Sequence, residues 1–105
     1  MKAMISQPMG GLTDEKIERV RKEAKSTLEE LGYEVIDTKL NFSDVYLKRK
    51  GVKHLSLHYL AVSLMEMATC DLVYFCKGWE KARGCVIEHE AAEKYGLDIM
   101  EETRS

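Results

Sequence analysis

A single carboxylate, that of Glu88, stands among small and apolar residues on one face of a predicted helix. The helix follows the glycine-rich, charged start of the stretch KGWEKARGCVIEHE, residues 77–90. Residues three, four and seven positions away share the face of Glu88, and they are Gly84, Cys85, Ala91, Ala92 and Tyr95. A helix turns such a face towards a sheet. A carboxylate there is costly unless it is paired or faces a ligand, so Glu88 is the leading catalytic candidate.

Two glycine-rich segments are candidate anion sites close to Glu88. QPMGG, residues 7–11, follows a predicted strand, and ARG, residues 82–84, begins the helix that carries Glu88. Glycine lets a backbone approach a ligand closely, and free N–H groups at a helix start attract negative charge. The substrate-binding candidates in these segments are Gln7, Met9, Gly10, Gly11, Arg83 and Gly84. The structural alternative is two ordinary turns, with Glu88 paired to a cation or to backbone N–H groups.

Aromatic and basic residues near these segments add further candidates. Trp79, the only tryptophan, is predicted on an exposed loop, where its face suits a base or a sugar; covering the sheet end or a subunit interface is the alternative. The long connection over residues 37–54 contains Tyr46 and several basic residues, and forms either a lid over an anionic ligand or a solvated loop. His54 and His58 have a metal-ligand spacing without an evident third ligand, so we predict no metal and no cofactor.

The predicted elements alternate between strands and helices along one domain, residues 1–105. The expected strands are residues 2–6, 33–36, 71–76 and 97–100, and the expected helices begin after Thr13 and cover residues 54–69 and 83–95. Such alternation indicates a parallel sheet with right-handed crossovers. We therefore expect a three-layer α/β fold of the flavodoxin or Rossmann type, with four strands in the order 2-1-3-4.

This strand order predicts where a ligand binds. The connections after the first and third strands leave towards opposite faces, and ligands bind outside the carboxyl ends of strands at such a switch point. The topology therefore places residues 7–11 beside residues 77–84, with Glu88 beneath both segments. That position favours a functional role for the carboxylate.

Composition narrows the class of protein. A chain of 105 residues suits one domain, and a net charge of -2 argues against binding to a nucleic acid polymer. Three cysteines, without a C-x-x-C pair or a signal peptide, predict a reducing cytoplasm, and Cys85 is better explained by packing than by chemistry. The longest apolar run, YLAVSL, is too short to span a membrane.

Two segments carry a family resemblance over nearly the whole chain. MISQPMGG and CDLVYFCKGWEKARGCVIEHEAAEKYGLDI resemble the nucleoside 2-deoxyribosyltransferase superfamily, and within it the small DUF4406 proteins. The most specific part is Gly84 followed four residues later by Glu88. The resemblance implies that Glu88 attacks the anomeric carbon of a 2-deoxynucleoside, releases the base and forms a glycosyl ester. It also implies that Gly10 and Gly11 hold a 5′-phosphate and that subunits share sites in a homodimer or larger oligomer.

The chain departs from the catalytic set of that superfamily. Where the family has a tyrosine, an aspartate, and a serine or aspartate, this chain has Met4 (or Ala3), Ser63 and Ala82, respectively. Of the usual set only Glu88 is present. Protonation of the leaving base then needs another donor, and Asp37 and Asp44 are candidates.

The sequence thus predicts a small cytoplasmic enzyme that cleaves the N-glycosidic bond of a nucleotide or deoxynucleoside. Hydrolysis is expected in preference to base transfer, because no second base site is visible. Glu88 is the expected nucleophile, with Ser63 and Trp79 completing the substrate contacts. The alternative is a non-catalytic nucleotide-binding protein, a sensor or sponge, and a third is an assembly protein without a ligand. The apolar surplus of the predicted helix at residues 54–69 indicates a contact between subunits.

Overall fold

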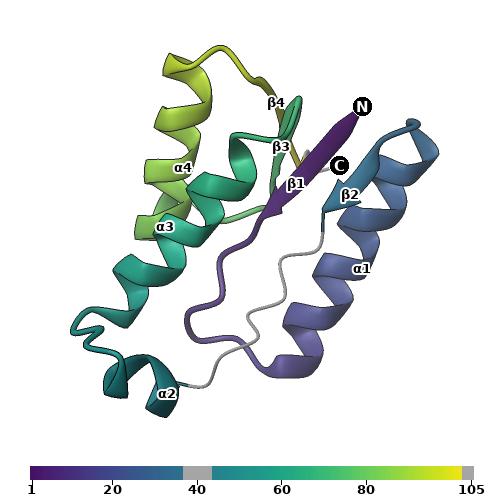
Figure 1. Cartoon of the computed structure of the whole chain (residues 1–105). Coiled ribbons are helices and arrows are strands. Elements are labelled where there is room, and N and C mark those ends of the chain that lie inside the picture. The colour runs from purple at the N-terminus through teal and green to yellow at the C-terminus, as the bar shows by residue number, and fades with distance from the viewer. Residues whose placement is uncertain (37–43, 103–105) are drawn as a thin grey trace.

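Four parallel strands form a single sheet in the order β2-β1-β3-β4, which confirms the predicted strand order. The computed structural model describes residues 1–36 and 44–102. In chain order its elements are β1 (Lys2–Ser6), α1 (Asp14–Glu30), β2 (Glu34–Ile36), α2 (Asp44–Arg49), α3 (Leu55–Met67), β3 (Leu72–Phe75), the 3-10 helix η1 (Trp79–Lys81), α4 (Arg83–Lys94) and β4 (Asp98–Glu101). Figure 1 shows the central sheet with α1 on one side and α3 and α4 on the other.

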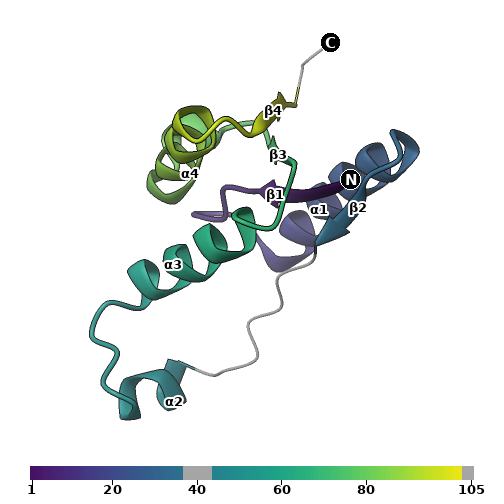
Figure 2. The same ribbon diagram turned by 45° about the horizontal axis from the view of Figure 1, so that its top comes forward.

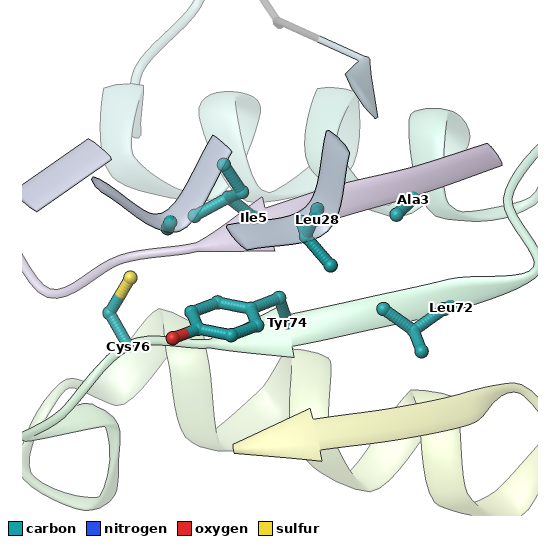
Figure 3. Packing of buried hydrophobic residues seen from close by; sticks show 7 residues of the cluster. Ala3, Ile5, Leu28, Leu72, Tyr74 and Cys76 are labelled. Carbon is teal, nitrogen blue, oxygen red and sulfur yellow. The ribbon is translucent and has the colours of Figure 1, made fainter. Parts of the chain in front are cut away.

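Alternate side chains of β1 and β3 build a core on each face of the sheet. Towards α1, the buried residues are Ala3, Ile5, Ala24, Leu28, Leu72, Tyr74 and Cys76, most of which are seen in Figure 3. Towards α3 and α4, they are Met4, Met67, Val73, Phe75 and Ala92. Every residue of β3 is buried, as its continuous apolar run predicts for a strand covered on both faces. Because the sheet is packed on both faces, the carboxyl ends of its central strands, where the candidate site lies, are held in place.

Local signals in the sequence set the limits of α1. The Thr13 side chain accepts a hydrogen bond from the backbone N–H of Lys16, which is an N-cap, and two acidic residues follow in the first turn. Ala24 and Leu28 face the core, whereas Leu31 is exposed. The chain leaves the helix at Gly32, whose φ of 91° suits glycine.

The connection between β2 and α3 differs from the prediction. Part of the expected unstructured segment forms α2, with the cations Lys48 and Arg49 in its last turn, where the helix dipole favours positive charge. Figures 1 and 2 show α2 beyond the start of α3, apart from the sheet. Residues 37–43, which include the proposed proton donor Asp37, lie outside the described residues. The predicted lid therefore stays a prediction.

α3 is apolar around much of its circumference, but it buries little of that surface. Met67 is its only fully buried residue, while Leu57 is 61% and Met65 is 73% exposed. None of the helices in the described parts of the chain is long and apolar enough to cross a membrane. The exposed side of α3 therefore presents a surface that is unusually apolar for one in contact with water.

Candidate functional site

The burial of Glu88 follows from the face that α4 turns to the sheet. Cys85, Glu88 and Ala92, which were predicted to share one face, are the buried residues of this helix, and Glu90 is exposed to solvent. Tyr95 was expected on the buried face, and that prediction is wrong. α4 ends at Lys94, and Tyr95 is the C-cap residue with 84% of its surface exposed.

A serine at the end of β1 is the partner of Glu88. The Ser6 hydroxyl donates a hydrogen bond to Oε1 of Glu88 over 2.9 Å, and both residues are buried. Ser6 is the last residue of β1, pairs with Phe75 of β3, and follows Met4 in pointing towards α3 and α4. The carboxylate therefore sits at the carboxyl end of β1, next to β3, where the switch point was predicted.

Burial dominates the electrostatics of Glu88. Loss of solvent raises the pKa of its carboxyl group, and the hydrogen bond from Ser6 lowers that pKa by a smaller amount. Within the described residues no lysine, arginine or histidine forms an ion pair with it. An ionised carboxylate has about four acceptor positions, of which Ser6 occupies one. The group therefore has capacity for further donors.

The cysteines near the site behave as packing residues. Burial raises the pKa of Cys85 above its ordinary value, despite an opposing hydrogen bond with Ser6. Burial, with a smaller contribution from Glu102, raises the pKa of Cys76 to about 12. Both groups are thus neutral thiols near pH 7 and poor nucleophiles, which agrees with the packing role expected for Cys85.

The turn at residues 7–11 lies beside the segment at residues 77–84, as the topology predicts. A side-chain carbon built on Gly78 would stand 3.7 Å from Cγ of Pro8, so the two segments are close neighbours there. Gly10 and Gly11 are exposed, and a carbon added to either meets nothing within 4 Å. Their backbone is accessible to a ligand.

The other two candidates in the first turn lie in different environments. Gln7 is buried and donates from Nε2 to the backbone oxygen of Ile17 over 2.7 Å, so it ties the turn to α1. Its Oε1 atom is buried without a hydrogen-bond partner in the described structure. Met9 is 54% exposed and free to contact a ligand.

Trp79 does not lie on an exposed loop, so that prediction is wrong. It begins η1, is partly buried against the core of α3 and α4, and packs on Phe75 with ring centroids 5.5 Å apart. Its indole nitrogen donates to Oε1 of Glu101 over 3.1 Å. A large aromatic ring gains more from covering the sheet end than from solvent, and this was the alternative reading of the sequence.

A cavity of about 540 Å³ lies between the start of α3 and the start of α4. Its lining includes His54, Leu57 and Leu60 on one side and Arg83, Gly84 and Ile87 on the other. The size is in the range of small-molecule sites. Its described lining includes neither Glu88 nor the turn at residues 7–11, but Gly84 precedes Glu88 by about one helical turn.

The remaining candidates are spread over α3 and its approach. Ser63 is partly buried in the middle of α3. His54 immediately precedes α3, and His58 lies in its first half. In the parts of the chain that the structure describes, no three histidine, cysteine or acidic side chains are grouped to hold a metal ion.

Sequence reasoning missed Ser6, His89 and Glu101. A period-two count from Met4 would have placed Ser6 on the α4 face of β1, at the carboxyl end where polar residues serve a ligand. His89 and Glu101 carried no local signal, because their contact depends on the packing of α4 against β4. Asp71, which precedes β3, accepts a hydrogen bond from the backbone N–H of Lys2 over 2.8 Å, which is a structural role.

A family model matches nearly the whole chain, but its description names no function. The chain belongs to the family described as Domain of unknown function (DUF4406), whose model matches residues 1–101. No curated protein and no solved structure matches the chain.

Proposed function

We propose that this DUF4406 protein binds a nucleotide or deoxynucleoside and hydrolyses its N-glycosidic bond, with Glu88 as the nucleophile. The observation that carries the proposal is a buried carboxylate at the switch point whose one described partner is the Ser6 hydroxyl. Burying a carboxylate without a cation costs stability. A substrate that develops positive charge, or that brings hydroxyl donors, offsets this cost. The resemblance to nucleoside 2-deoxyribosyltransferases points to the same residue.

The proposed reaction has two steps. An Oε atom of Glu88 bonds to the anomeric carbon as the bond from that carbon to the base nitrogen breaks, and the bonding pair leaves with the base. A water oxygen then bonds to the anomeric carbon as the ester bond from that carbon to Oε breaks, and its electron pair returns to Glu88 as the carboxylate. The proton of the water passes to the residue that had protonated the leaving base. The nucleophile must be ionised, and the Ser6 hydrogen bond favours that form. Asp44 is our candidate for protonating the leaving base, together with Asp37.

The surrounding residues fit substrate binding. Gly10 and Gly11 offer exposed backbone for a 5′-phosphate, and Arg83 and Gly84 form one wall of the cavity between the starts of α3 and α4. Gln7 would act mainly by tying the turn to α1, and Met9 and Ser63 by contact with the substrate. Trp79 contacts the substrate only at the edge that its packing leaves exposed.

A non-catalytic nucleotide-binding protein is the second candidate, and the raised pKa of Glu88 favours it. A carboxyl group that keeps its proton is a poor nucleophile but a good hydrogen-bond donor to a base or phosphate. Ser63 stands where the nucleoside 2-deoxyribosyltransferase superfamily has its catalytic aspartate, and this difference also favours a binding protein.

We further propose that the protein is a homodimer or larger oligomer that works in the cytoplasm. The exposed apolar side of α3, with Leu57 and Met65, is the expected contact between subunits. The three cysteines are free thiols, which suits a reducing compartment.

The test of function is base release from a panel of ribo- and deoxyribonucleotides, followed by chromatography, with binding measured in parallel by calorimetry. Both Glu88→Ala and Glu88→Gln should abolish release while affinity persists, because the carboxylate acts on the transition state. Glu90→Gln, an exposed change two residues away on the same helix, is the matched control and should keep full activity. Base release by Glu88→Ala at the wild-type rate would exclude Glu88 as nucleophile. Micromolar binding without release by the wild type would establish the binding protein instead.

A further inference from the structure

Beside the candidate site, four side chains from η1, α4, β3 and β4 form a compact cluster. The rings of Trp79 and His89 are stacked, with centroids 4.0 Å apart and planes within 3° of parallel. Phe75 packs against both rings, at 5.5 and 4.7 Å. Glu101 lies along the edge of the stack, where Oε1 accepts from Trp79 and Oε2 is 3.8 Å from Nε2 of His89.

Histidine is the side chain whose charge can change in the physiological pH range, and His89 is the histidine of this cluster. Its Nε2 atom is buried and has no hydrogen-bond partner in the described structure, and the nearest carboxylate oxygen is that of Glu101. A proton on both ring nitrogens gives a cation that faces this carboxylate and lies flat on an indole. Both contacts are favourable for the charged ring, since indole is the best aromatic partner for a cation.

Other charged groups lie on the elements around His89 and Trp79. Glu93 lies one turn further along α4 and is exposed. The cavity beside Trp79 is lined by the charged residues Lys77, Glu80, Lys81, Glu101 and Glu102. Phe75 of β3 contributes only its ring. Glu101 is therefore the one carboxylate within 4 Å of the imidazole among the described residues.

The cluster anchors the segment at residues 77–82. Trp79 is the side chain by which η1 packs on the core, and a side-chain carbon added to Gly78, which precedes it, would meet Pro8 of the neighbouring turn. We propose that His89, Trp79 and Glu101 form a proton-sensitive clasp that holds residues 77–82 to β4, and that the clasp is tighter when His89 is protonated. The clasp is independent of any chemistry at Glu88, so failure of the proposed hydrolysis leaves it standing.

Fluorescence provides the first test, because Trp79 is the only tryptophan. A protonated imidazole quenches an indole on which it is stacked, so emission should fall as the pH is lowered from 8 to 5.5. His89→Phe keeps a ring against Trp79 and should abolish the fall. His54→Gln and His58→Gln remove the other two histidines and should retain it. Unchanged quenching in His89→Phe would overturn the assignment of the titrating group.

Hydrogen exchange tests whether the charge holds the loop. The amides of Lys81 and Ala82 donate to Gly78 and Trp79 within the loop, so their protection reports its opening. Their protection factors should be about fivefold higher at pH 5.5 than at pH 8, the effect of one exposed cation–π contact, after correction by the amides of α1. Glu101→Gln keeps an acceptor for Trp79 but removes the charge, and should reduce this gain. It replaces a half-exposed side chain and should fold. Equal protection at both pH values in the wild type would overturn the clasp.

Discussion

Replacing Glu88 by glutamine should make the stability of the protein less sensitive to pH. Burial raises the pKa of Glu88 in the folded state, so the folded protein holds this proton more tightly than the unfolded chain does. The contribution of this group to stability is present below the unfolded pKa, and it is lost as the pH rises through the higher folded pKa. Glutamine has no such loss.

The size of the effect comes from two opposing contributions. A buried ion costs several kcal/mol, and a hydrogen bond to a charged group offsets about 1.5–3 kcal/mol of that cost. With Ser6 as the one described donor, we expect Glu88→Gln to gain about 1–2 kcal/mol relative to the wild type between pH 4 and pH 8. For a domain of this size that corresponds to a relative rise in Tm of about 4–16 °C. Any misfit of the amide is equal at both pH values and cancels.

The measurement is the urea unfolding free energy of both proteins at several pH values, followed by circular dichroism. Glu90→Gln is the matched control, because Glu90 is exposed and forms only a surface pair with Lys94. Its effect should be within about 0.5 kcal/mol. A Glu88→Gln difference that stays flat or falls with increasing pH would show that the native state does not favour the protonated carboxyl group, which refutes the reasoning.

Two further predictions concern the fold and its assembly. Thr13→Ala should lower the free energy of unfolding by about 1 kcal/mol, because the N-cap hydrogen bond to Lys16 is lost, whereas Thr13→Ser should retain it; equal urea midpoints for all three proteins would contradict the cap. Met65→Lys should convert the proposed oligomer to a monomer with unchanged helix content, because it places a charge on the exposed apolar side of α3; Lys22→Met on α1 is the control. Light scattering that shows a wild-type monomer at high micromolar concentration would remove the basis of the interface.

The architecture was predictable from the sequence because its signals are local. Thr13 and Gly32 mark the ends of α1, and the run from Leu72 to Phe75 has the composition of a strand covered on both faces. Alternation of these elements then restricts the topology to few choices. α2 was missed because its six residues carry no repeating apolar pattern.

Details of the site were less predictable because they depend on register and packing. Helical spacing predicted that Glu88 is buried, but its partner depends on which face of β1 carries Ser6. A tryptophan suits a ligand contact and a packing role equally well. For Trp79, only the positions of His89 and Glu101 decide between these two roles. Such contacts join residues that are far apart in sequence, where spacing carries no information.

The free-energy cost of burying the Glu88 carboxylate also distinguishes the two proposed functions. A buried carboxylate without a cation is a destabilised ground state, and a ligand relieves it in one of two ways. A bound ligand that donates hydrogen bonds relieves it on binding, so loss of the carboxylate weakens affinity. A sugar that develops positive charge relieves it only in the transition state, so loss of the carboxylate removes turnover and leaves affinity intact. The same substitution that removes the pH-dependent cost of Glu88 therefore shows which function that cost serves.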